Sequence, residues 1–507
     1  MDPSRALLRR IVVCRQHMRT AAVSREQKCR SLHTNVIDTL RERNFIHSVT
    51  SQDIHACAAS SVAVYCGVDP TASSLHLGNM VTLMSLLHFH VAGHKAIPLV
   101  GNATGMIGDP SGRSTERVAL DRDTLAANVA GIEAQLERFF TRGTEYALKR
   151  DSSIDSRSLK KIRILHNADW YHGMNILAFL GSVGRYSRVG AMMARDSVKS
   201  RITSANGISY TEFSYQLLQA YDFWHLFHNH GCRIQIGGSD QWGNITAGTD
   251  LIHRMDYDQV QKTGVIHENN GGTSIDRAFG LTIPLLTTSS GEKFGKSAGN
   301  AIWLDERRTS PFDIYQFFVK TADADVERFL NMFTFLPKKT IQDVVAEHQT
   351  CPEKFVAQKL LAAEVTELIH GVSGIRQALC ATEVLFGNGQ SDVQGFSACD
   401  FADAFAHDKR MVSVPRSAVY GKSISDIAVL TGACRSKSEA SRLVQGGGLY
   451  WNNQPVSDAK WIPAADSTSV GCSNFVGDGT IGILRTGKTN YRLLRLLDSD
   501  QETKEQV

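Results

Sequence analysis

The sequence predicts an α/β protein with a parallel sheet, followed by an α-helical domain and a small α+β domain. Three observations lead to this prediction. Strand and helix patterns alternate early in the chain, helical patterns dominate later, and short segments with turn signals fill the last part. The expected domains are residues 35–310, 311–415 and 416–507, after a leader of residues 1–34.

The composition is that of a globular protein. Of 507 residues, 42% are hydrophobic and 21% are charged. No apolar run has the length of a membrane-spanning helix, so we expect no membrane insertion. Ten cysteines are scattered without a C-x-x-C pair. The sequence therefore predicts reduced thiols, with neither a disulfide framework nor a metal site.

The first 34 residues differ from the rest. They are rich in Arg and poor in acidic residues, with Leu, Ile and Val between the arginines. This composition predicts a mitochondrial transit peptide and a location in the mitochondrial matrix. A disordered basic tail is the alternative. The leader carries more positive charge than the whole chain, whose net charge is +4. The positive net charge of the whole chain therefore does not indicate a nucleic-acid partner.

The first elements form a β-α-β unit. The stretch "SSVAVYCGVDP" contains a short apolar strand, and "SLHLGNMVTLMSLLHFHVAGH" repeats apolar residues at helical spacing until Gly93, which can end the helix. The next strand, "KAIPLV", runs into the glycine-rich loop "GNATGMIGDPSG". A strand-helix-strand unit of this length makes the sheet parallel, and its ligand is expected beyond the carboxyl ends of the strands.

The following elements continue the α/β pattern. Residues 121–230 are expected to be largely helical, including the aromatic helix "TEFSYQLLQAYDFWHLF". Then "CRIQI" and "FGLTIPLL" are strand patterns, and the polar loop "TTSSGEKFGKSAGN" follows the second of them.

Two short motifs suggest phosphate chemistry. "HLGN" begins a helix, where free N–H groups and the helix dipole favour an anion. "KFGKS", far along the chain, places Lys293 and Lys296 in a loop that can act on developing phosphate charge. Either motif alone would be weak, because a turn histidine or a solvated loop would explain it.

Together the two motifs resemble the HIGH and KMSKS signatures of class I aminoacyl-tRNA synthetases. The longer stretches "YCGVDPTASSLHLGN", "GNATGMIGDPSGR", "YTEFSYQLLQAYDF" and "IGGSDQWGNITAG" resemble the tyrosyl-tRNA synthetase family. The resemblance covers residues 45–335 strongly and 416–497 more loosely. It implies a Rossmann-like catalytic domain, with a helical insertion that forms a homodimer interface and an anticodon-binding helical domain.

The resemblance also implies residues for the amino-acid substrate. Tyr65 and Asp222 would bind the phenol hydroxyl of L-tyrosine, whose absence in an analogue leaves buried polar groups unpaired. Asp109, Tyr215 and Gln219 would hold the ammonium, with Asn167 and Gln241 contributing. Independently of the resemblance, positions 215, 219 and 222 share one helix face, as a pocket wall requires, although core packing gives the same spacing.

Further residues are implied for ATP. Those on the side of the first helix are Gly67, Asp69, Thr71, His76, Gly78 and Asn79, and those on the opposite half of the sheet are Gly238 and Asp240. The residues expected to act in catalysis are Thr71, His76, Asn79, Lys293 and Lys296. The sequence departs from HIGH at Asn79 and from KMSKS at Phe294 and Gly295, but both lysines remain.

The implied reaction needs no protein nucleophile. The tyrosine carboxylate attacks ATP, which arrives with Mg²⁺, and tRNA(Tyr) accepts tyrosine from the adenylate. There are two alternatives. One is a tryptophanyl-tRNA synthetase, and the other is an RNA-binding or splicing protein on a synthetase fold that has lost its enzyme activity. Tyr65 with Asp222 argues against the first, and the retained lysines and carboxylates argue against the second.

One further motif, "GILRTGKT" at residues 482–489, matches the phosphate-binding loop pattern. Too little chain follows it for a nucleotide fold, and the sequence reads better as two strands around a Thr-Gly-Lys turn. The last domain is similar to a small RNA-binding fold of the ribosomal-protein-like type. We expect one phosphate-binding face formed by Arg435, Lys437, Arg442, Arg485, Lys488 and Arg492.

Overall fold

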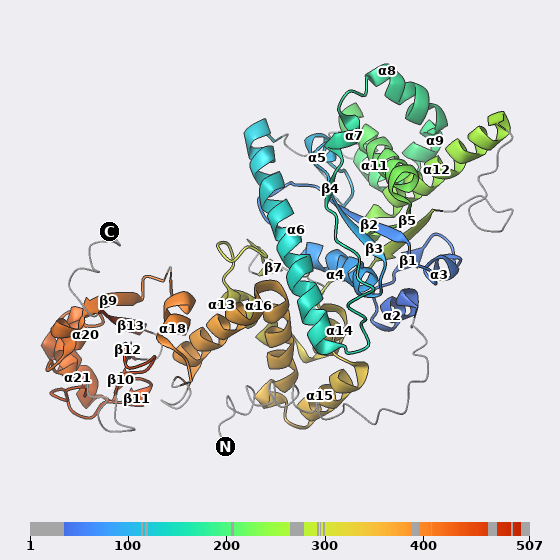
Figure 1. The fold of residues 1–507 in the computed structure, drawn as a ribbon. Coiled ribbons are helices and arrows are strands. Elements are labelled where there is room, and N and C mark those ends of the chain that lie inside the picture. Colours follow the sequence, from blue (N-terminus) through green and yellow to red (C-terminus); the bar gives the residue numbers. More distant parts are fainter. Residues whose placement is uncertain are drawn as a thin grey trace, which may run out of the picture. The chain divides into compact units, whose positions relative to one another are not determined.

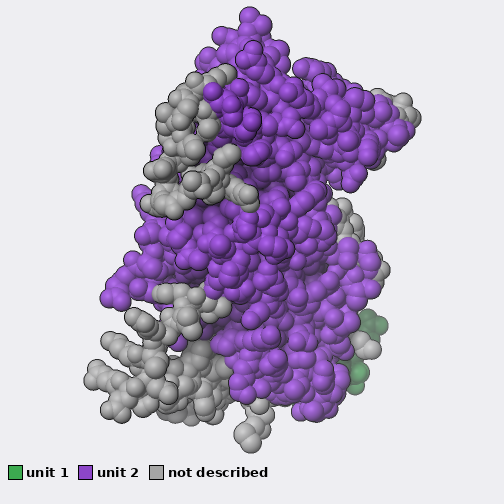
Figure 2. Space-filling view, turned by 90° about the vertical axis from the view of Figure 1, so that its right-hand side faces the viewer, with its two compact units in different colours: residues 1–30, 311–315, 371–507 green, residues 31–310, 316–370 purple. Residues whose placement is uncertain are grey.

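A computed structural model provides the structure. It describes residues 35–112, 115–116, 120–203, 207–263, 278–289, 300–387, 395–406, 408–464, 474–487 and 490–497, together with residues 291, 294, 296, 297 and 393. The chain divides into two compact units, coloured separately in Figure 2. The larger unit contains residues 31–310 and 316–370, and the smaller contains residues 311–315 and 371–507. This division falls inside the predicted helical domain 311–415, so the domain limits stay a prediction.

The larger unit is built on a six-stranded sheet (Figure 1). Its strand order is β1-β6-β5-β2-β3-β4, and all neighbouring strands are parallel except β1 and β6. The bounds are β1 Ser48–Val49, β2 Ala63–Val68, β3 Lys95–Val100, β4 Leu165–His166, β5 Cys232–Gly238 and β6 Phe279–Ile283. Strand β3 lies beside β2 on one side, and β5, which comes later in the chain, lies beside β2 on the other side. The switch point of this topology therefore lies between β2 and β5, where α/β folds bind ligands.

Helices cover both faces of this sheet, as its buried strands require. Helix α4 (Leu77–Val91) packs on β2, β3 and β5, and α6 (Arg122–Arg150) packs on α4. Helix α11 (Tyr210–His230) and α12 (Trp242–Thr263) pack on β5. The expected β-α-β unit is confirmed, and Gly93 follows its helix with φ 89°. Shorter helices of this region are α2 Val36–Glu42, α3 Ile54–Cys57, α5 Thr104–Ile107 and η2 Ser239–Gln241.

The expectation that residues 121–230 are largely helical is confirmed, with one interruption. Residues 151–164 form no helix, and β4 joins the sheet directly after them. Strand β4 has two residues, too short for an alternating pattern, so only pairing with β3 reveals it. Five short elements then gather over α11 and α12 (Figure 1). They are α7 Ala168–Tyr171, α8 Ile176–Phe179, η1 Leu180–Gly184, α9 Val189–Met193 and α10 Asp196–Ile202.

A helical segment follows the sheet. It contains α13 Pro311–Val319, α14 Asp323–Phe333, α15 Lys338–Thr350, η3 Pro352–Lys354 and α16 Val356–Phe386. Before it, the two-residue strands β7 Lys296–Ser297 and β8 Asn300–Ala301 pair with each other. The backbone of α16 is non-helical at Gly371, with φ 73°, and the division between the two compact units falls at the same residue.

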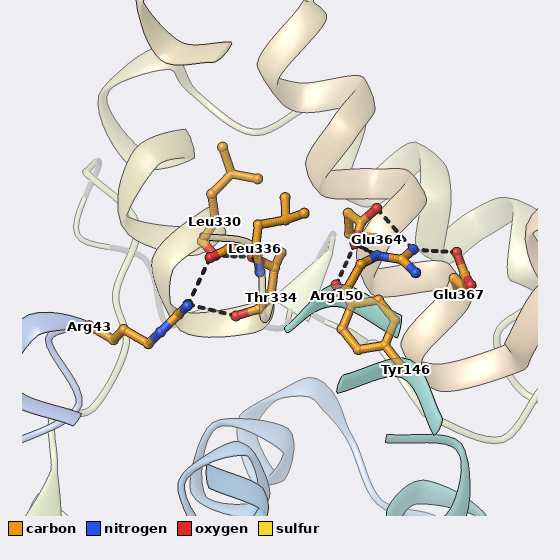
Figure 3. A network of polar contacts seen from close by, with 8 residues as sticks. All are labelled: Arg43, Tyr146, Arg150, Leu330, Thr334, Leu336, Glu364 and Glu367. Carbon is orange, nitrogen blue, oxygen red and sulfur yellow. Dashed lines mark hydrogen bonds and ion pairs between the residues drawn. The ribbon is translucent and has the colours of Figure 1, made fainter. Parts of the chain in front are cut away.

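Buried polar contacts attach the first part of this segment to the sheet domain (Figure 3). Arg150 of α6 contacts Glu364 at 2.8 Å and Glu367 at 2.6 Å, both on α16, and Tyr146 donates to Glu364. Arg43, after α2, donates to three backbone carbonyls at and after the end of α14. These carbonyls have no partners within the helix, so Arg43 serves as a cap from another element.

The smaller unit contains a five-stranded sheet of order β11-β10-β12-β13-β9. Its strands are β9 Met411–Pro415, β10 Leu449–Trp451, β11 Gln454–Pro455, β12 Ile481–Thr486 and β13 Asn490–Leu497, and its helices are α18 Ala398–Ala404, α19 Arg416–Val419, α20 Ile424–Leu430 and α21 Lys437–Gln445. Strand β9 pairs with β13, so the predicted boundary at residue 416 cuts one strand from its sheet. Strands β12 and β13 form an antiparallel hairpin, which confirms the strand-turn-strand interpretation of "GILRTGKT".

Candidate active site

A cavity of about 390 Å³ opens at the carboxyl ends of β2 and β5. This is the switch point of the sheet, where the βα connections separate and helix N-termini point inward. The sequence-predicted residues along its wall are Tyr65, Gly67, Asp69, Thr71, His76, Gly78, Asn79, Asp109, Asn167, Tyr215, Gln219, Asp222, Gly238, Asp240 and Gln241. The structure thus brings together residues from five separated segments of the chain.

One part of the wall is built around the buried carboxylate of Asp222, on α11. Asn167 donates to it at 3.1 Å, Trp170 at 2.8 Å and Tyr171 at 3.0 Å. Burial raises the pKa of Asp222 to about 7, although these three donors act in the opposite direction. Trp170 and Tyr171 were not predicted from the sequence. Their aromatic, donor-bearing side chains next to Asn167 in "NADWY" were the available signal.

Tyr65, on β2, lies on the same wall. It is 1% exposed, and within the described part of the chain its hydroxyl has no hydrogen-bond partner. Burial, with the nearby charge of Asp222 second, raises the pKa of Tyr65 well above its usual value. An unpaired buried hydroxyl is costly, so its place on a cavity wall points to a polar ligand.

A second polar cluster surrounds Asp109. Gln241 donates to one of its oxygens at 2.7 Å, and Asn244 and the backbone of Ser111 donate to the other. The Asp109 carboxylate is 8% exposed. It combines a fixed orientation with a negative charge facing the cavity, which suits a small cation such as an ammonium group.

Tyr215 makes a contact that the sequence did not predict. Its hydroxyl donates to Asp69 at 2.8 Å, and Thr104 donates to the other oxygen of Asp69 at 2.7 Å. Asp69, predicted for ATP, therefore also orients Tyr215, which was predicted for the ammonium. Gln235 of β5 lines the cavity too; it is 2% exposed, and its carbonyl oxygen has no partner among the described residues. A glutamine between two isoleucines in a buried strand was the missed signal.

The start of α4 forms the anion-binding side. His76 is the N-cap: its Nδ1 accepts from the Asn79 backbone, and the Asn79 side chain accepts from the His76 backbone. At the position where the sequence departs from HIGH, the Asn79 amide oxygen fills the capping role. Since Nδ1 is an acceptor, the neutral His76 ring carries its proton on Nε2.

Glycines keep this side open. A Cβ at Gly78 would lie 2.8 Å from the His76 ring and displace it, and one at Gly238 would lie 2.5 Å from Asp240. At Gly67, the exposed position of an otherwise buried β2, a Cβ would meet nothing within 4 Å. A flat or charged ligand can therefore approach the β2 backbone closely.

The structure links the HLGN motif to the segment that follows KFGKS. His76 forms a bridge with Trp303, and the backbones of Leu75 and Leu77 bond to residues 304 and 302. The strand pair that contains the Lys296 backbone leads directly into this segment. Lys293 lies outside the described residues. Phe294, which replaces the methionine of KMSKS, is 4% exposed among four phenylalanine rings, Phe317, Phe318, Phe329 and Phe333. Phe294 is thus held in a cluster of aromatic rings.

The predicted RNA-binding residues do not share one face. Tyr450 and Tyr491 are the register partners of Arg485, and its guanidinium lies 3.7 Å from the Tyr450 ring centre. Arg492 pairs with Leu484, so the strand alternation places it on the opposite face. The prediction of one face is therefore corrected for Arg485. Lys437 forms an ion pair with Asp426, Arg435 and Arg442 are at or near α21, and Lys488 lies outside the described residues.

Comparisons with known proteins identify the family. Residues 58–387 match the family described as class I tRNA synthetases for tryptophan and tyrosine, and residues 403–506 match the tyrosyl-tRNA synthetase C-terminal domain. The chain is 43% identical over 470 residues to the chloroplastic/mitochondrial tyrosine–tRNA ligase of Arabidopsis thaliana, covering 91% of this chain and 84% of that protein. The chain belongs to the tyrosyl-tRNA synthetase family. The tryptophanyl alternative is thereby set aside.

Other relatives agree with this assignment. The mitochondrial tyrosine–tRNA ligase of Drosophila melanogaster is 40% identical over 433 residues, 85% of this chain and 87% of that one. A truncated mitochondrial tyrosyl-tRNA synthetase from Aspergillus nidulans has a TM-score of 0.61 and 38% identity, covering 68% of this chain and 92% of that chain. The predicted class I tyrosine–tRNA ligase, with tyrosine, ATP and tRNA as its substrates, is confirmed.

Proposed function

We propose that Tyr65 and Asp222 bind the phenol hydroxyl of tyrosine in this cavity. The ammonium group of tyrosine is bound by Asp109, Tyr215 and Gln219. The unpaired, buried hydroxyl of Tyr65 is the observation that supports this most directly. A phenol O–H can donate to Asp222 and accept from Tyr65, which gives both buried groups a partner. Gln241 orients Asp109, and Asn167 orients Asp222.

The proposed chemistry follows from this placement. The tyrosine carboxylate attacks the α-phosphorus of ATP, the bond to the bridging oxygen breaks, and pyrophosphate leaves tyrosyl-adenylate. A ribose hydroxyl at the 3′ end of tRNA then attacks the carbonyl carbon, and AMP leaves. His76 Nε2–H and the first backbone N–H groups of α4 would bind the phosphates, beside Thr71 and Asn79.

The remaining ATP contacts come from the opposite half of the sheet and from the loop. Gly238 and Asp240 would meet the adenosine, and Gly67 would let it approach β2. Lys293 and Lys296 would act on the charge of the transition state. Mg²⁺ would arrive as part of MgATP, because it binds through phosphates with few protein ligands. Among the described residues, no group of three or more His, Cys, Asp or Glu could hold a metal.

A Tyr65→Phe variant tests the proposed tyrosine site. Losing one hydrogen bond to the substrate should lower kcat/KM for tyrosine about tenfold in ATP–pyrophosphate exchange, and phenylalanine should be rejected less well. Tyr315→Phe, at a buried tyrosine that does not line the cavity, is the matched control. Unchanged discrimination between tyrosine and phenylalanine in Tyr65→Phe would contradict the assignment.

We also propose a two-fold homodimer formed through the short helices over α11 and α12. Exposed apolar side chains gather there, at Ile176, Leu177, Leu180, Val189 and Met193. A second copy of the chain would cover them in a self-complementary contact.

Leu177→Glu should disrupt this dimer. Leu177 is 78% exposed, so glutamate is tolerated in the free chain, but in the interface it would be buried without a partner. Sedimentation should show twice the chain mass for the unchanged protein and one chain mass for the variant. Leu430→Glu, at an exposed leucine of the smaller unit, should remain dimeric. A single-chain mass for the unchanged protein would refute the proposal.

The proposed location is the mitochondrial matrix, on the composition of residues 1–34, which lie outside the described residues. Organellar enzymes among the relatives support it. No helix of the described part of the chain is long and apolar enough to cross a membrane. We further propose that Arg435, Lys437, Arg442, Lys488 and Arg492 contact tRNA phosphates.

A further inference from the structure

The connection between β2 and α4 carries three residues of the proposed ATP site, Asp69, Thr71 and His76. Its residues 69–75 form no helix or strand, so their backbone polar groups depend on partners from other elements. Helix α6 lies against this connection and supplies several of those partners. The contacts between α6 and the connection therefore bear on the geometry of the ATP site.

Gln135 of α6 makes three of these contacts. Its Oε1 accepts from the Ser74 hydroxyl at 3.0 Å and from the Leu75 backbone N–H at 2.9 Å, and its Nε2 donates to the Ser73 carbonyl at 3.3 Å. Gln135 is 5% exposed, so water does not compete for these bonds. One buried amide thus fixes three consecutive residues immediately before His76.

Two further residues lie on the same face of α6, because positions 128, 131 and 135 follow helical spacing. Asn128 is 6% exposed, and its Nδ2 donates to the Pro70 carbonyl at 3.0 Å. At Gly131, a Cβ would lie 2.8 Å from the carbonyl oxygen of Ser73. A glycine is therefore needed for the connection to lie this close to the helix.

The segment after KFGKS holds the same connection through other contacts. The Leu304 backbone donates to the Leu75 carbonyl at 2.8 Å, and the Asp305 backbone donates to the Ser74 hydroxyl at 3.3 Å. Both backbone groups of Leu75 are thus bound, the N–H by Gln135 and the carbonyl by Leu304. The residue next to His76 cannot shift without breaking a hydrogen bond at a buried position.

We propose that Asn128, Gly131 and Gln135 are positioning residues for the activation of tyrosine by ATP. This inference rests on the proposed function, in which Thr71, His76 and the start of α4 bind the phosphates. None of the three α6 residues lines the cavity formed by the described residues. They act by holding the connection that carries Thr71 and His76, and small displacements of such groups strongly lower the rate of the chemical step.

Gln135→Leu tests the proposal in ATP–pyrophosphate exchange. The connection loses three hydrogen bonds, so we expect kcat to fall about 10²-fold. The KM for tyrosine should stay nearly unchanged, because Tyr65 and Asp222 lie on other elements. Gln358→Leu is the matched control, since it removes a buried amide that donates to Asp323, far from the cavity wall. It should lower the melting temperature without lowering kcat. An equal loss of kcat in Gln358→Leu would overturn the positioning role.

Gly131→Ala separates positioning from the loss of hydrogen bonds. Alanine favours a helix more than glycine does, and the change removes no polar group. Its Cβ must nevertheless displace the Ser73 carbonyl, so we expect kcat for exchange to fall about tenfold. Gly143→Ala, on the same helix, is the control, because its Cβ would meet the movable side chain of Leu87 instead. It should exchange like the unchanged enzyme.

A double-mutant cycle separates this inference from the proposed function. His76→Asn keeps an N-cap acceptor and loses the Nε2–H donor. If Gln135 acts through His76, then Gln135→Leu should lower kcat less in the His76→Ala or His76→Asn protein than in the unchanged protein. Normal exchange in His76→Asn would refute the proposed phosphate contact itself. A large effect of His76→Asn with normal kcat in Gln135→Leu, or with fully additive losses, would overturn the positioning role alone.

Discussion

Asp222→Asn should lower kcat/KM for tyrosine by roughly 10²–10³-fold. The carboxylate is 3% exposed, and donors from Asn167, Trp170 and Tyr171 fix its orientation. A hydrogen bond from the phenol to this charge contributes about 1.5–3 kcal/mol. The asparagine NH₂ would also face one of three donors, which adds to the loss. ATP–pyrophosphate exchange measures the effect. Asp169→Asn, at an exposed position of the same segment, should behave like the unchanged enzyme.

The same residue gives this prediction a pH dependence. Burial raises the pKa of Asp222 to about 7, so near neutral pH part of the empty enzyme holds a protonated carboxyl. The ionised carboxylate of Asp222 accepts a hydrogen bond from the substrate phenol better than the protonated carboxyl does. The value of kcat/KM for tyrosine should therefore rise between about pH 6 and pH 8, since this parameter reports groups of the free enzyme. An equal rise in Asp222→Asn would assign the titration to another group.

Arg150→Met should destabilise the larger unit by about 3–5 kcal/mol, because it leaves Glu364 and Glu367 buried without their cation. Both carboxylates lie on α16, and Figure 3 shows them converging on the guanidinium. Burial lowers the pKa of Arg150, but the charge of Glu364 more than offsets this, so Arg150 remains charged. We expect the melting temperature to fall by roughly 10 °C.

Two comparisons separate this buried charge from ordinary surface charge. Arg157→Met removes an ion pair whose arginine side chain is 90% exposed, and it should cost less than about 1 kcal/mol. Combining Arg150→Met with Glu364→Gln and Glu367→Leu removes every charge and keeps an acceptor for Tyr146, so most of the stability should return. A melting temperature for Arg150→Met equal to that of Arg157→Met would contradict the argument.

Local patterns in the sequence sufficed for the β-α-β unit, for the helix that begins after His76 and for the hairpin at "GILRTGKT". Each depends on residues close in the chain: apolar periodicity, a capping sequence, or a turn between two strands. The residues of the proposed tyrosine and ATP sites also followed from the sequence, because the family motifs are long and their order is specific. Trp170, Tyr171 and Gln235 were missed, since no motif marks them.

The tertiary structure alone decided what depends on distant segments. Strand β4 is too short to show an alternating hydrophobic pattern, and only its pairing with β3 identifies it as a strand. The bridge between His76 and Trp303 joins the HLGN motif to a segment far along the chain, shortly after KFGKS. The register of β12 and β13 separates Arg485 from Arg492. Such contacts form only when chain folding brings remote residues together, and periodicity along the sequence carries no record of which segments will meet.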